Sequence, residues 1–167
     1  MRGRLAACTW LIGLLFITVP VMASSETLRD FDGTPQKLSN YTGKGKWLVV
    51  MIWASDCHIC NVEVHNYVDF QTFHADQNAT VLGISMDGAA KKTDAVAFIK
   101  RHEVNFPNLI GEPAAVAALY TRLTDRPWVG TPSFLIYSPE GELKAQQVGA
   151  VPPHIIEAYI QRHEPGS

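Results

Sequence analysis

The chain has 167 residues, 47% of them hydrophobic, and a formal net charge of −2 at pH 7. This length suits one domain with a sizeable core and is too short for two. The sequence contains no strongly basic stretch, no low-complexity segment and no internal repeat. Composition therefore gives no sign of a nucleic-acid-binding protein or a repeat protein.

The N-terminus has the pattern of a targeting segment. Two arginines precede an apolar run over 5–19, and Ala23 ends a stretch that suits a signal-peptide cleavage site. We therefore predict a signal peptide over 1–23 and a single domain over 24–167. An uncleaved membrane anchor is the alternative, because the uncharged stretch before Glu26 reaches the roughly 17–25 residues that span a bilayer. Both alternatives place the domain outside the cytoplasm, in the periplasm.

The first elements of the domain are two short strands. Asp32-Gly33 is a strong hairpin signal, so 24–41 is predicted to form an N-terminal β-hairpin extension. A polar loop over 42–46 follows. The next stretch, 47–52, is short, apolar and rich in β-branched residues, which predicts a buried central strand.

Two cysteines separated by two residues follow this strand. Cys57 and Cys60 precede a predicted helix over 61–75, so both lie where a strand passes into a helix N-terminus. The first turn of a helix has unpaired N–H groups and favours negative charge. A thiol at that position ionises more readily, and the thiolate is the nucleophile of disulfide exchange. A C-x-x-C beside a βαβ pattern is typical of a thioredoxin-like redox site.

Cysteine spacing argues against a purely structural bridge. Apart from Cys8 in the targeting segment, Cys57 and Cys60 are the only cysteines. A bridge between them closes a very small loop, and the stabilisation by a disulfide grows with loop length. We interpret the pair as redox-active; a static disulfide and a metal site are the alternatives.

The remaining elements alternate between strand and helix. Strands are predicted over 79–85, 105–110, 133–137 and 142–148, and helices over 93–102, 113–123 and 152–163. The order βαβαβαββα predicts an α/β three-layer sandwich with a mixed central sheet flanked by helices, in which a parallel portion is joined by an antiparallel hairpin.

Four segments resemble the extracytoplasmic thioredoxin-like proteins of the TlpA/ResA/CcmG group, and the resemblance covers essentially the whole domain. The segments are Phe31-Asp-Gly33 with Leu38-Ser-Asn-Tyr41, Trp53-Ala54 with Cys57-x-x-Cys60-x-x-Glu63, Gly83-Ile-Ser-Met-Asp87, and Gly130-Thr-Pro132-Ser-Phe-Leu-Ile with Gly141. The pattern departs from the group at Asp56, where a second Trp is common, and at Ile59, where Pro is common.

The resemblance implies a thioredoxin-like fold in which the bond before Pro132 is cis and faces the disulfide. Thr131 would then offer its N–H and C=O to an incoming substrate strand. The alternative is that Pro132 merely begins an edge strand.

The resemblance also implies a role for Glu63. Thioredoxins usually place a buried acid on the strand six residues before the first cysteine, but that position here is Met51. Glu63 lies three residues after Cys60, on the same helix face, and would accept the proton of Cys60. A solvated helix glutamate is the alternative interpretation.

These residues predict a thiol–disulfide oxidoreductase, most simply a protein-disulfide reductase, with Cys57 as the exposed nucleophile. Trp53 and Trp128 are candidates for an apolar substrate-binding rim, with ordinary core or loop aromatics as the alternative. The resemblance implies exported disulfide proteins as substrates, including apocytochrome c (cytochrome c maturation) or copper-site cysteines. It also implies a membrane thiol transporter as electron donor, and no cofactor beyond the redox-active disulfide.

Three other functions compete with this prediction. A disulfide oxidant or isomerase would use the same cysteines in the opposite direction. A Cu(I)-binding metallochaperone would use both thiolates and a histidine, because soft ligands select that ion; the six histidines show no zinc-site spacing, so no metal ligand is predicted. A passive binding domain with an inert disulfide is the third alternative.

Overall fold

The computed structural model describes residues 28–164. The predicted signal peptide or anchor, and Cys8 with it, lies outside these residues. Between 28 and 164 no helix combines the length and the apolar composition needed to cross a membrane.

A seven-stranded mixed sheet forms the centre of the molecule, with strand order β2-β1-β5-β4-β3-β6-β7. Strands β3, β4 and β5 run parallel, and every other pairing is antiparallel. The elements in chain order are β1 (Leu28–Asp30), β2 (Pro35–Gln36), the 3₁₀ turn η1 (Leu38–Asn40), β3 (Trp47–Trp53), α1 (His58–His74), β4 (Ala79–Ser85), α2 (Lys92–Arg101), β5 (Asn108–Ile110), α3 (Pro113–Thr124), β6 (Ser133–Tyr137), β7 (Leu143–Val148) and α4 (Pro153–His163).

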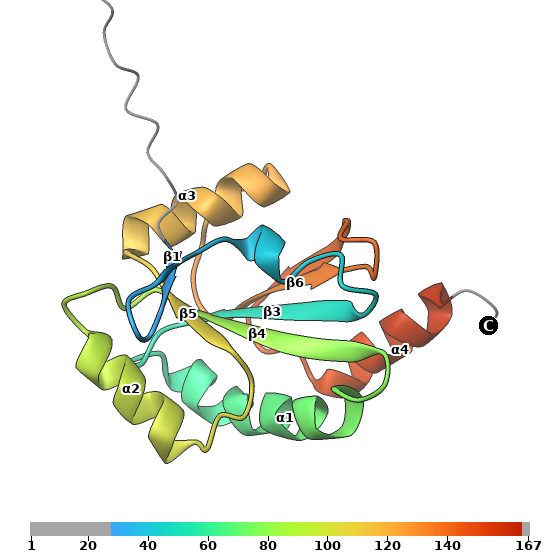
Figure 1. Ribbon diagram of the computed structural model, residues 1–167, viewed down its shortest axis with the longest axis horizontal. Coiled ribbons are helices and arrows are strands. Elements are labelled where there is room, and N and C mark those ends of the chain that lie inside the picture. Colours follow the sequence, from blue (N-terminus) through green and yellow to red (C-terminus); the bar gives the residue numbers. More distant parts are fainter. Residues whose placement is uncertain (1–27, 165–167) are drawn as a thin grey trace, which may run out of the picture.

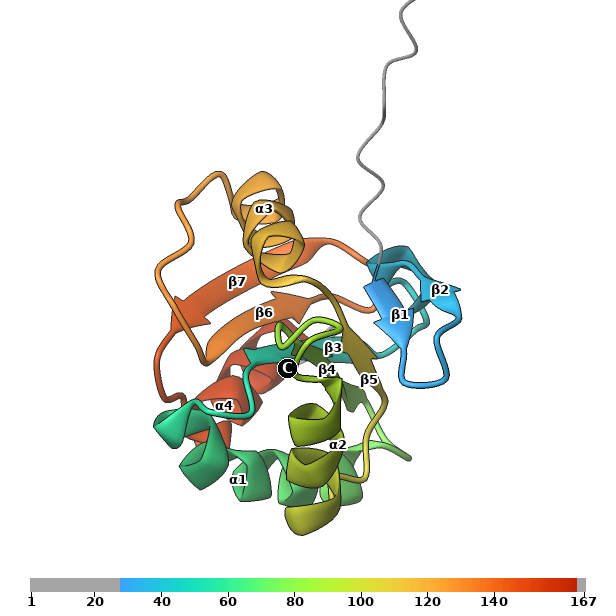
Figure 2. The same ribbon diagram turned by 90° about the vertical axis from the view of Figure 1, so that its left-hand side faces the viewer.

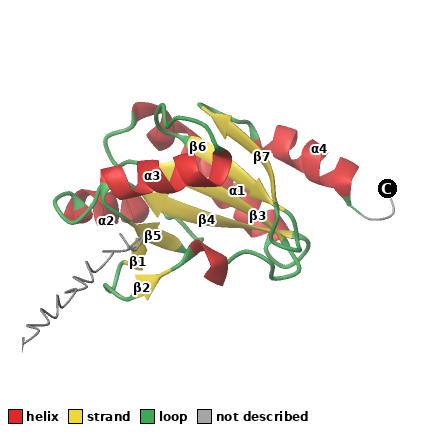
Figure 3. Ribbon diagram, turned by 90° about the horizontal axis from the view of Figure 1, so that it is seen from above, coloured by secondary structure: helices red, strands yellow, loops and turns green. Residues whose placement is uncertain are grey.

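Helices cover both faces of the sheet, as Figure 1 shows: α3 lies on one side, and α1, α2 and α4 lie on the other. Figure 3, seen from the α3 side, shows that helix crossing the strands. Side chains of a strand alternate between faces, so β3 contributes to two cores. Val49, Met51 and Trp53 pack with α1, α2 and α4, whereas Val50 and Ile52 pack with α3.

The predicted three-layer α/β sandwich is confirmed. The two N-terminal strands form the expected hairpin, in which Gly33 has the positive φ of +95° that the turn requires. This hairpin joins the main sheet through β1 and β5, and Figure 2 shows it at the opposite edge of the sheet from β7.

Two predicted boundaries were wrong in ways that matter for function. Helix α1 begins at His58, three residues before the predicted start, because Cys57 already has the extended backbone of an N-cap residue. Strand β3 continues to Trp53, one residue past the predicted end.

The sheet register brings three chain segments together at one end. Trp53 at the end of β3 pairs with Ser85 at the end of β4. Ser133 at the start of β6 pairs with Ile52 on the other side of β3. The loops that leave β3 and β4, and the loop that enters β6, therefore meet at the carboxyl end of the central strands.

Candidate active site

The two cysteines form a disulfide at the N-terminus of α1, with a Cα–Cα distance of 5.2 Å. Cys57 is the N-cap residue, and its Sγ accepts the backbone N–H of Cys60 at 3.0 Å. Cys57 is half-buried, whereas Cys60 has no exposed surface. The structure thus gives the two sulfurs different access: a second protein can reach Cys57, and Cys60 can be reached only from Cys57.

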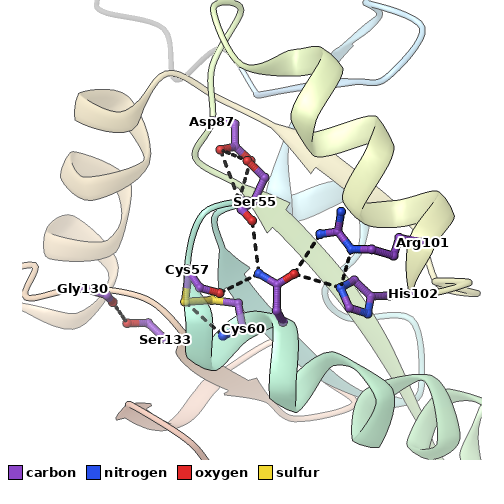
Figure 4. Close-up of a disulfide and its surroundings, with 9 residues drawn as sticks. Ser55, Cys57, Cys60, Asp87, Arg101, His102, Gly130 and Ser133 are labelled. Carbon is purple, nitrogen blue, oxygen red and sulfur yellow. Dashed lines mark hydrogen bonds between the residues drawn. A yellow bond between two sulfur atoms is a disulfide. The ribbon is translucent and has the colours of Figure 1, made fainter.

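The segment 54–57, which we call the cysteine loop, is fixed by a buried carboxylate (Figure 4). Asp87 follows β4 and is 6% exposed. It accepts the Ser55 N–H at 3.0 Å and the Ser55 Oγ–H at 2.8 Å, and also the Ser85 Oγ–H at 2.8 Å. Hydrogen bonds to a charged group are stronger than neutral ones, so Asp87 holds the loop firmly against the end of β4.

Asn61 holds the same loop from the helix side. Its Nδ2 donates to the carbonyl oxygen of Cys57 at 2.8 Å and to that of Ser55 at 3.1 Å. Its Oδ1 faces the end of α2, where Arg101 Nη2 donates to it at 2.8 Å and His102 Nε2 lies at 3.0 Å. One amide group therefore connects the cysteine loop to α2.

An exposed ion pair lies beside Cys57. Lys91 Nζ is 2.6 Å from Asp56 Oδ2, and this hydrogen bond holds the pKa of Asp56 below its ordinary value. Ser55, Asp56, Lys91 and Arg101 line a small cleft of about 190 Å³ on this side of the loop. The Lys91 charge offsets the negative charge that Asp56 places next to Cys57.

The segment 125–132, which we call the proline loop, approaches the disulfide from the other side. The peptide bond between Thr131 and Pro132 is cis. Figure 4 shows Gly130 and Ser133 on the side of the disulfide opposite Arg101 and His102, and Ser133 Oγ–H donates to the Gly130 carbonyl at 2.7 Å. Neither the N–H nor the C=O of Thr131 has a hydrogen-bond partner among residues 28–164. The residues that flank the predicted docking pair, Gly130 and Ser133, thus lie beside the disulfide, and the backbone groups of Thr131 have no partner among the described residues.

Glu63 lies one turn after Cys60 on α1 and is half-buried. Its Oε2 is buried, without a hydrogen-bond partner in the part of the chain that the structure describes. Tyr67 lies one turn further on, and burial together with the Glu63 charge raises the pKa of its hydroxyl. The Tyr67 hydroxyl donates instead to the Val151 carbonyl at 2.7 Å, which leaves the Glu63 oxygen free.

The prediction that Trp53 contributes to an exposed rim was wrong. Trp53 is 1% exposed, stacks on Phe98 with ring centroids 4.2 Å apart, and donates its Nε1–H to Asn108 Oδ1 at 3.0 Å. As the last residue of β3 it points into the core between the sheet and α2. The contact depends on Gly83, where a Cβ would lie 1.8 Å from the Asn108 oxygen.

Trp128 lies in the proline loop, is half-buried and packs edge-on against Tyr120 of α3 at 5.2 Å. Its neighbour Val129 is 69% exposed, and Ile59 and Val62 on α1 are 44% and 58% exposed. Apolar side chains are thus exposed on both segments that border the disulfide. A rim role for Trp128 stays a prediction.

Comparison with known proteins identifies the family. The profile described as the AhpC/TSA family matches residues 20–146. The chain belongs to the AhpC/TSA family. No curated protein gives a significant match.

Solved structures similar to this AhpC/TSA member share the thioredoxin-like fold. A thiol:disulfide interchange protein DsbE from Chlorobium tepidum is 23% identical, with a TM-score of 0.65, over 81% of this chain and 89% of the other. The thioredoxin domain of a thiol-disulfide oxidoreductase from Bacteroides vulgatus is 20% identical, with a TM-score of 0.65, over 79% and 90%. A secreted Mycobacterium tuberculosis disulfide oxidoreductase is 21% identical, with a TM-score of 0.59, over 77% and 90%. The predicted resemblance to thioredoxin-like proteins of this kind is confirmed.

Sequence reasoning missed the residues that support the cysteine loop of this family member. Asp87 had a signal, because a polar residue two positions after the end of a buried strand lies at the carboxyl edge of a parallel sheet. Asn61, Arg101 and His102 had none, because 40 residues separate Asn61 from Arg101 in the sequence. Between 28 and 164, no three His, Cys, Asp or Glu side chains are grouped as metal ligands.

Proposed function

We propose that this protein is a thiol–disulfide oxidoreductase that exchanges the Cys57–Cys60 disulfide with cysteines of other proteins. One observation carries the proposal: the accessible Cys57 Sγ lies at a helix N-terminus and accepts the N–H of Cys60, whose own sulfur is fully buried. An N–H that donates to a sulfur favours the thiolate over the thiol. The arrangement suits a nucleophile paired with a resolving cysteine, and a bridge with only a structural role needs neither feature.

In the reductive direction the reaction has two steps. The Cys57 thiolate attacks a substrate disulfide, so a bond forms between Cys57 Sγ and one substrate sulfur, and the other substrate sulfur leaves as a thiolate. The Cys60 thiolate then attacks Cys57 Sγ, which re-forms the Cys57–Cys60 bond and releases the second substrate thiolate. Two electrons pass from the cysteine pair to the substrate.

Glu63 is the proposed proton acceptor for Cys60. A buried thiol needs a base close by, because Cys60 must lose its proton before it can attack. The Glu63 Oε2 atom is buried and has no hydrogen-bond partner among the described residues. Glu63 lies three residues after Cys60, which places the two side chains on the same face of the helix. The buried hydroxyl on this side of the helix, that of Tyr67, donates its hydrogen bond to the Val151 carbonyl and does not compete for the role.

The proline loop is the proposed substrate-docking segment. The N–H and C=O of Thr131, which have no hydrogen-bond partner among the described residues, can pair with an extended substrate strand. Pro132 itself has no N–H to offer. The exposed apolar side chains of Val129, Ile59 and Val62 can pack against an unfolded segment of a substrate protein that contains the substrate disulfide.

We further propose that the protein works outside the cytoplasm as a reductase of exported proteins, recharged by a membrane thiol transporter. The predicted targeting segment and the accessible disulfide support this placement. Apocytochrome c and copper-site cysteines are the substrates that the sequence resemblance suggests. A reduction potential well above that of the compartment would instead assign the protein as an oxidant or isomerase.

Trapping of mixed disulfides tests the proposal. In Cys60→Ser the second step cannot occur, so substrates should remain covalently bound to Cys57 when the variant is isolated from its native compartment. Addition of a reductant should then release them. Cys57→Ser is the matched control: it keeps one sulfur, but a buried one, and should capture nothing. No capture by Cys60→Ser, together with a Cys57 that a thiol probe does not label after mild reduction, would contradict the proposal and favour the inert-disulfide alternative.

A further inference from the structure

Besides the disulfide, few groups hold the Cys57 backbone in place. Its N–H donates to the Ala54 carbonyl at 3.2 Å. Its carbonyl oxygen accepts two hydrogen bonds from Asn61, one from the backbone N–H at 3.1 Å and one from Nδ2 at 2.8 Å. Asn61 Nδ2 also binds the Ser55 carbonyl at 3.1 Å, so a single side chain ties both ends of 55–57 to the helix.

Asn61 is itself oriented by α2. Its NH₂ group is occupied by two carbonyl oxygens, so its Oδ1 must accept hydrogen bonds from the other side. Arg101 Nη2 supplies one at 2.8 Å, and His102 Nε2 lies at 3.0 Å. The amide therefore cannot rotate without the loss of four hydrogen bonds.

The His102 ring fits this orientation. Burial, followed by the charges of Arg101 and His65, holds the pKa of His102 below its ordinary value of 6.5. In the tautomer that carries its proton on Nε2, the ring donates to Asn61 Oδ1 at 3.0 Å, and its Nδ1 can accept from His65 Nε2 at 3.0 Å. The approach of Arg101 Nε to His102 Nε2 at 3.4 Å would need the opposite tautomer; the two shorter contacts decide between them.

We infer that Asn61, oriented by Arg101 and His102, is a positioning residue that stabilises the reduced form of the cysteine pair relative to the disulfide form. The inference rests on the proposed function. In the disulfide form the covalent bond to Cys60 fixes Cys57 at the helix N-terminus, and the Asn61 hydrogen bonds are partly redundant. In the reduced form that bond is gone, and Asn61 keeps the Cys57 sulfur where the Cys60 N–H can stabilise its negative charge.

The test compares Asn61→Leu with wild type in a glutathione redox buffer. Leucine has the same branching and the same number of side-chain heavy atoms as asparagine, and it makes no hydrogen bond. The equilibrium between protein dithiol plus oxidised glutathione and protein disulfide plus reduced glutathione should shift roughly tenfold towards the protein disulfide, because two hydrogen bonds of ordinary strength are lost mainly from the reduced form. A tenfold change corresponds to a reduction potential lower by about 30 mV. Alkylation of reduced Cys57 at pH 6 should slow several-fold.

Asn105→Leu is the matched control. Asn105 Nδ2 also donates to a carbonyl of α1, that of Val68 at 3.2 Å, and to Thr72 Oγ1 at 2.9 Å. These contacts lie towards the opposite end of the helix from the disulfide. Asn105→Leu should lower stability without any change in the glutathione equilibrium. Arg101→Met, with Lys100→Met as its control, removes the Arg101 contact that orients Asn61 but leaves the Asn61 side chain in place. It should shift the equilibrium in the same direction by a smaller factor.

Unfolding of both redox states separates positioning from a structural role. A merely structural Asn61 would lower the stability of the disulfide and dithiol forms equally, which leaves the glutathione equilibrium unchanged and overturns the inference. Positioning predicts a larger loss in the dithiol form. A wild-type protein that does not exchange with glutathione overturns the proposed function and this inference together; exchange by wild type with no shift in Asn61→Leu or Arg101→Met overturns the inference alone.

Discussion

The two loops that border the disulfide are built in opposite ways. The cysteine loop is fixed by Asp87 on one side and by Asn61 on the other, with Lys91 paired to Asp56 at its surface. The proline loop is held mainly at its ends, where Arg126 N–H donates to Thr124 Oγ1 and the Pro132 carbonyl accepts from Gly149. Between these ends, Val129 is exposed and Thr131 has no backbone partner among the described residues.

This difference matches a division of labour. A nucleophile must be positioned accurately, so rigid support of Cys57 favours reaction. A surface that receives many protein segments gains from unused backbone groups and apolar side chains, which pair with any extended chain. We therefore expect substitutions near the cysteine loop to change stability and the redox equilibrium, and substitutions in the proline loop to change substrate affinity.

The two tryptophans provide the strongest test of this comparison. Trp53→Ala removes a buried ring and its hydrogen bond to Asn108, so we expect a loss of about 3–5 kcal/mol in unfolding free energy, measured by denaturant titration. Trp128→Ala should cost about 1–2 kcal/mol, because part of that ring is exposed. Trp128→Ala should instead raise KM for a protein disulfide, and equal stability losses in the two variants would contradict the comparison.

Asp87 is the second test. Asp87→Ala leaves the N–H and hydroxyl of Ser55 without their acceptor, and we expect a loss of about 2–3 kcal/mol in unfolding free energy. Asp69→Ala, on the exposed face of α1, is the control and should have little effect. The proline-loop counterpart is Ser133→Ala, which removes one neutral hydrogen bond and should cost about 1 kcal/mol. A larger effect for Ser133→Ala than for Asp87→Ala would mean that the proline loop is the more firmly held.

The smallest expected effect concerns pH. Burial, Arg101 and His65 hold the pKa of His102 below 6.5, so the folded protein binds a proton at this ring less readily than the unfolded chain does. Stability should therefore fall as pH decreases through 6.5, and this contribution should be absent well above that value. His102→Gln should flatten the pH dependence of the unfolding midpoint between pH 7 and pH 5. The exposed His154, replaced by Gln, should leave the slope as it is in wild type.

The fold followed from local sequence signals to a large extent. Strands β4 and β6 have the predicted limits, because each is a short apolar run bounded by polar or turn residues. Strand β5 begins at Asn108, three residues after the predicted start. The errors that affect the site lie at β3 and α1, because Trp53 fits the end of a strand and the start of a loop equally well. As the last strand residue, Trp53 continues the alternation of β3, so its side chain joins Val49 and Met51 in the core on the face of α1 and α2.

The site was predictable only as far as its motifs extend. Cys57, Cys60 and Pro132 belong to recognisable patterns, and the structure brings the segments that contain them together. The supporting groups could not be foreseen, because the contacts of Asn61 with Arg101 and His102 depend on how α1 and α2 pack. Sequence spacing carries no information about such contacts.

The burial of Cys60 also bears on survival under oxidative stress. A peroxide that reaches the reduced pair meets the sulfur of Cys57 first and converts it to a sulfenic acid. Cys60 is sheltered from the oxidant but within bonding distance of that sulfur, so it can condense with the sulfenic acid and expel water before irreversible sulfinic acid forms. In the proposed exchange reaction, the same placement would return an oxidised Cys57 to the ordinary disulfide, from which a reductant restores the dithiol.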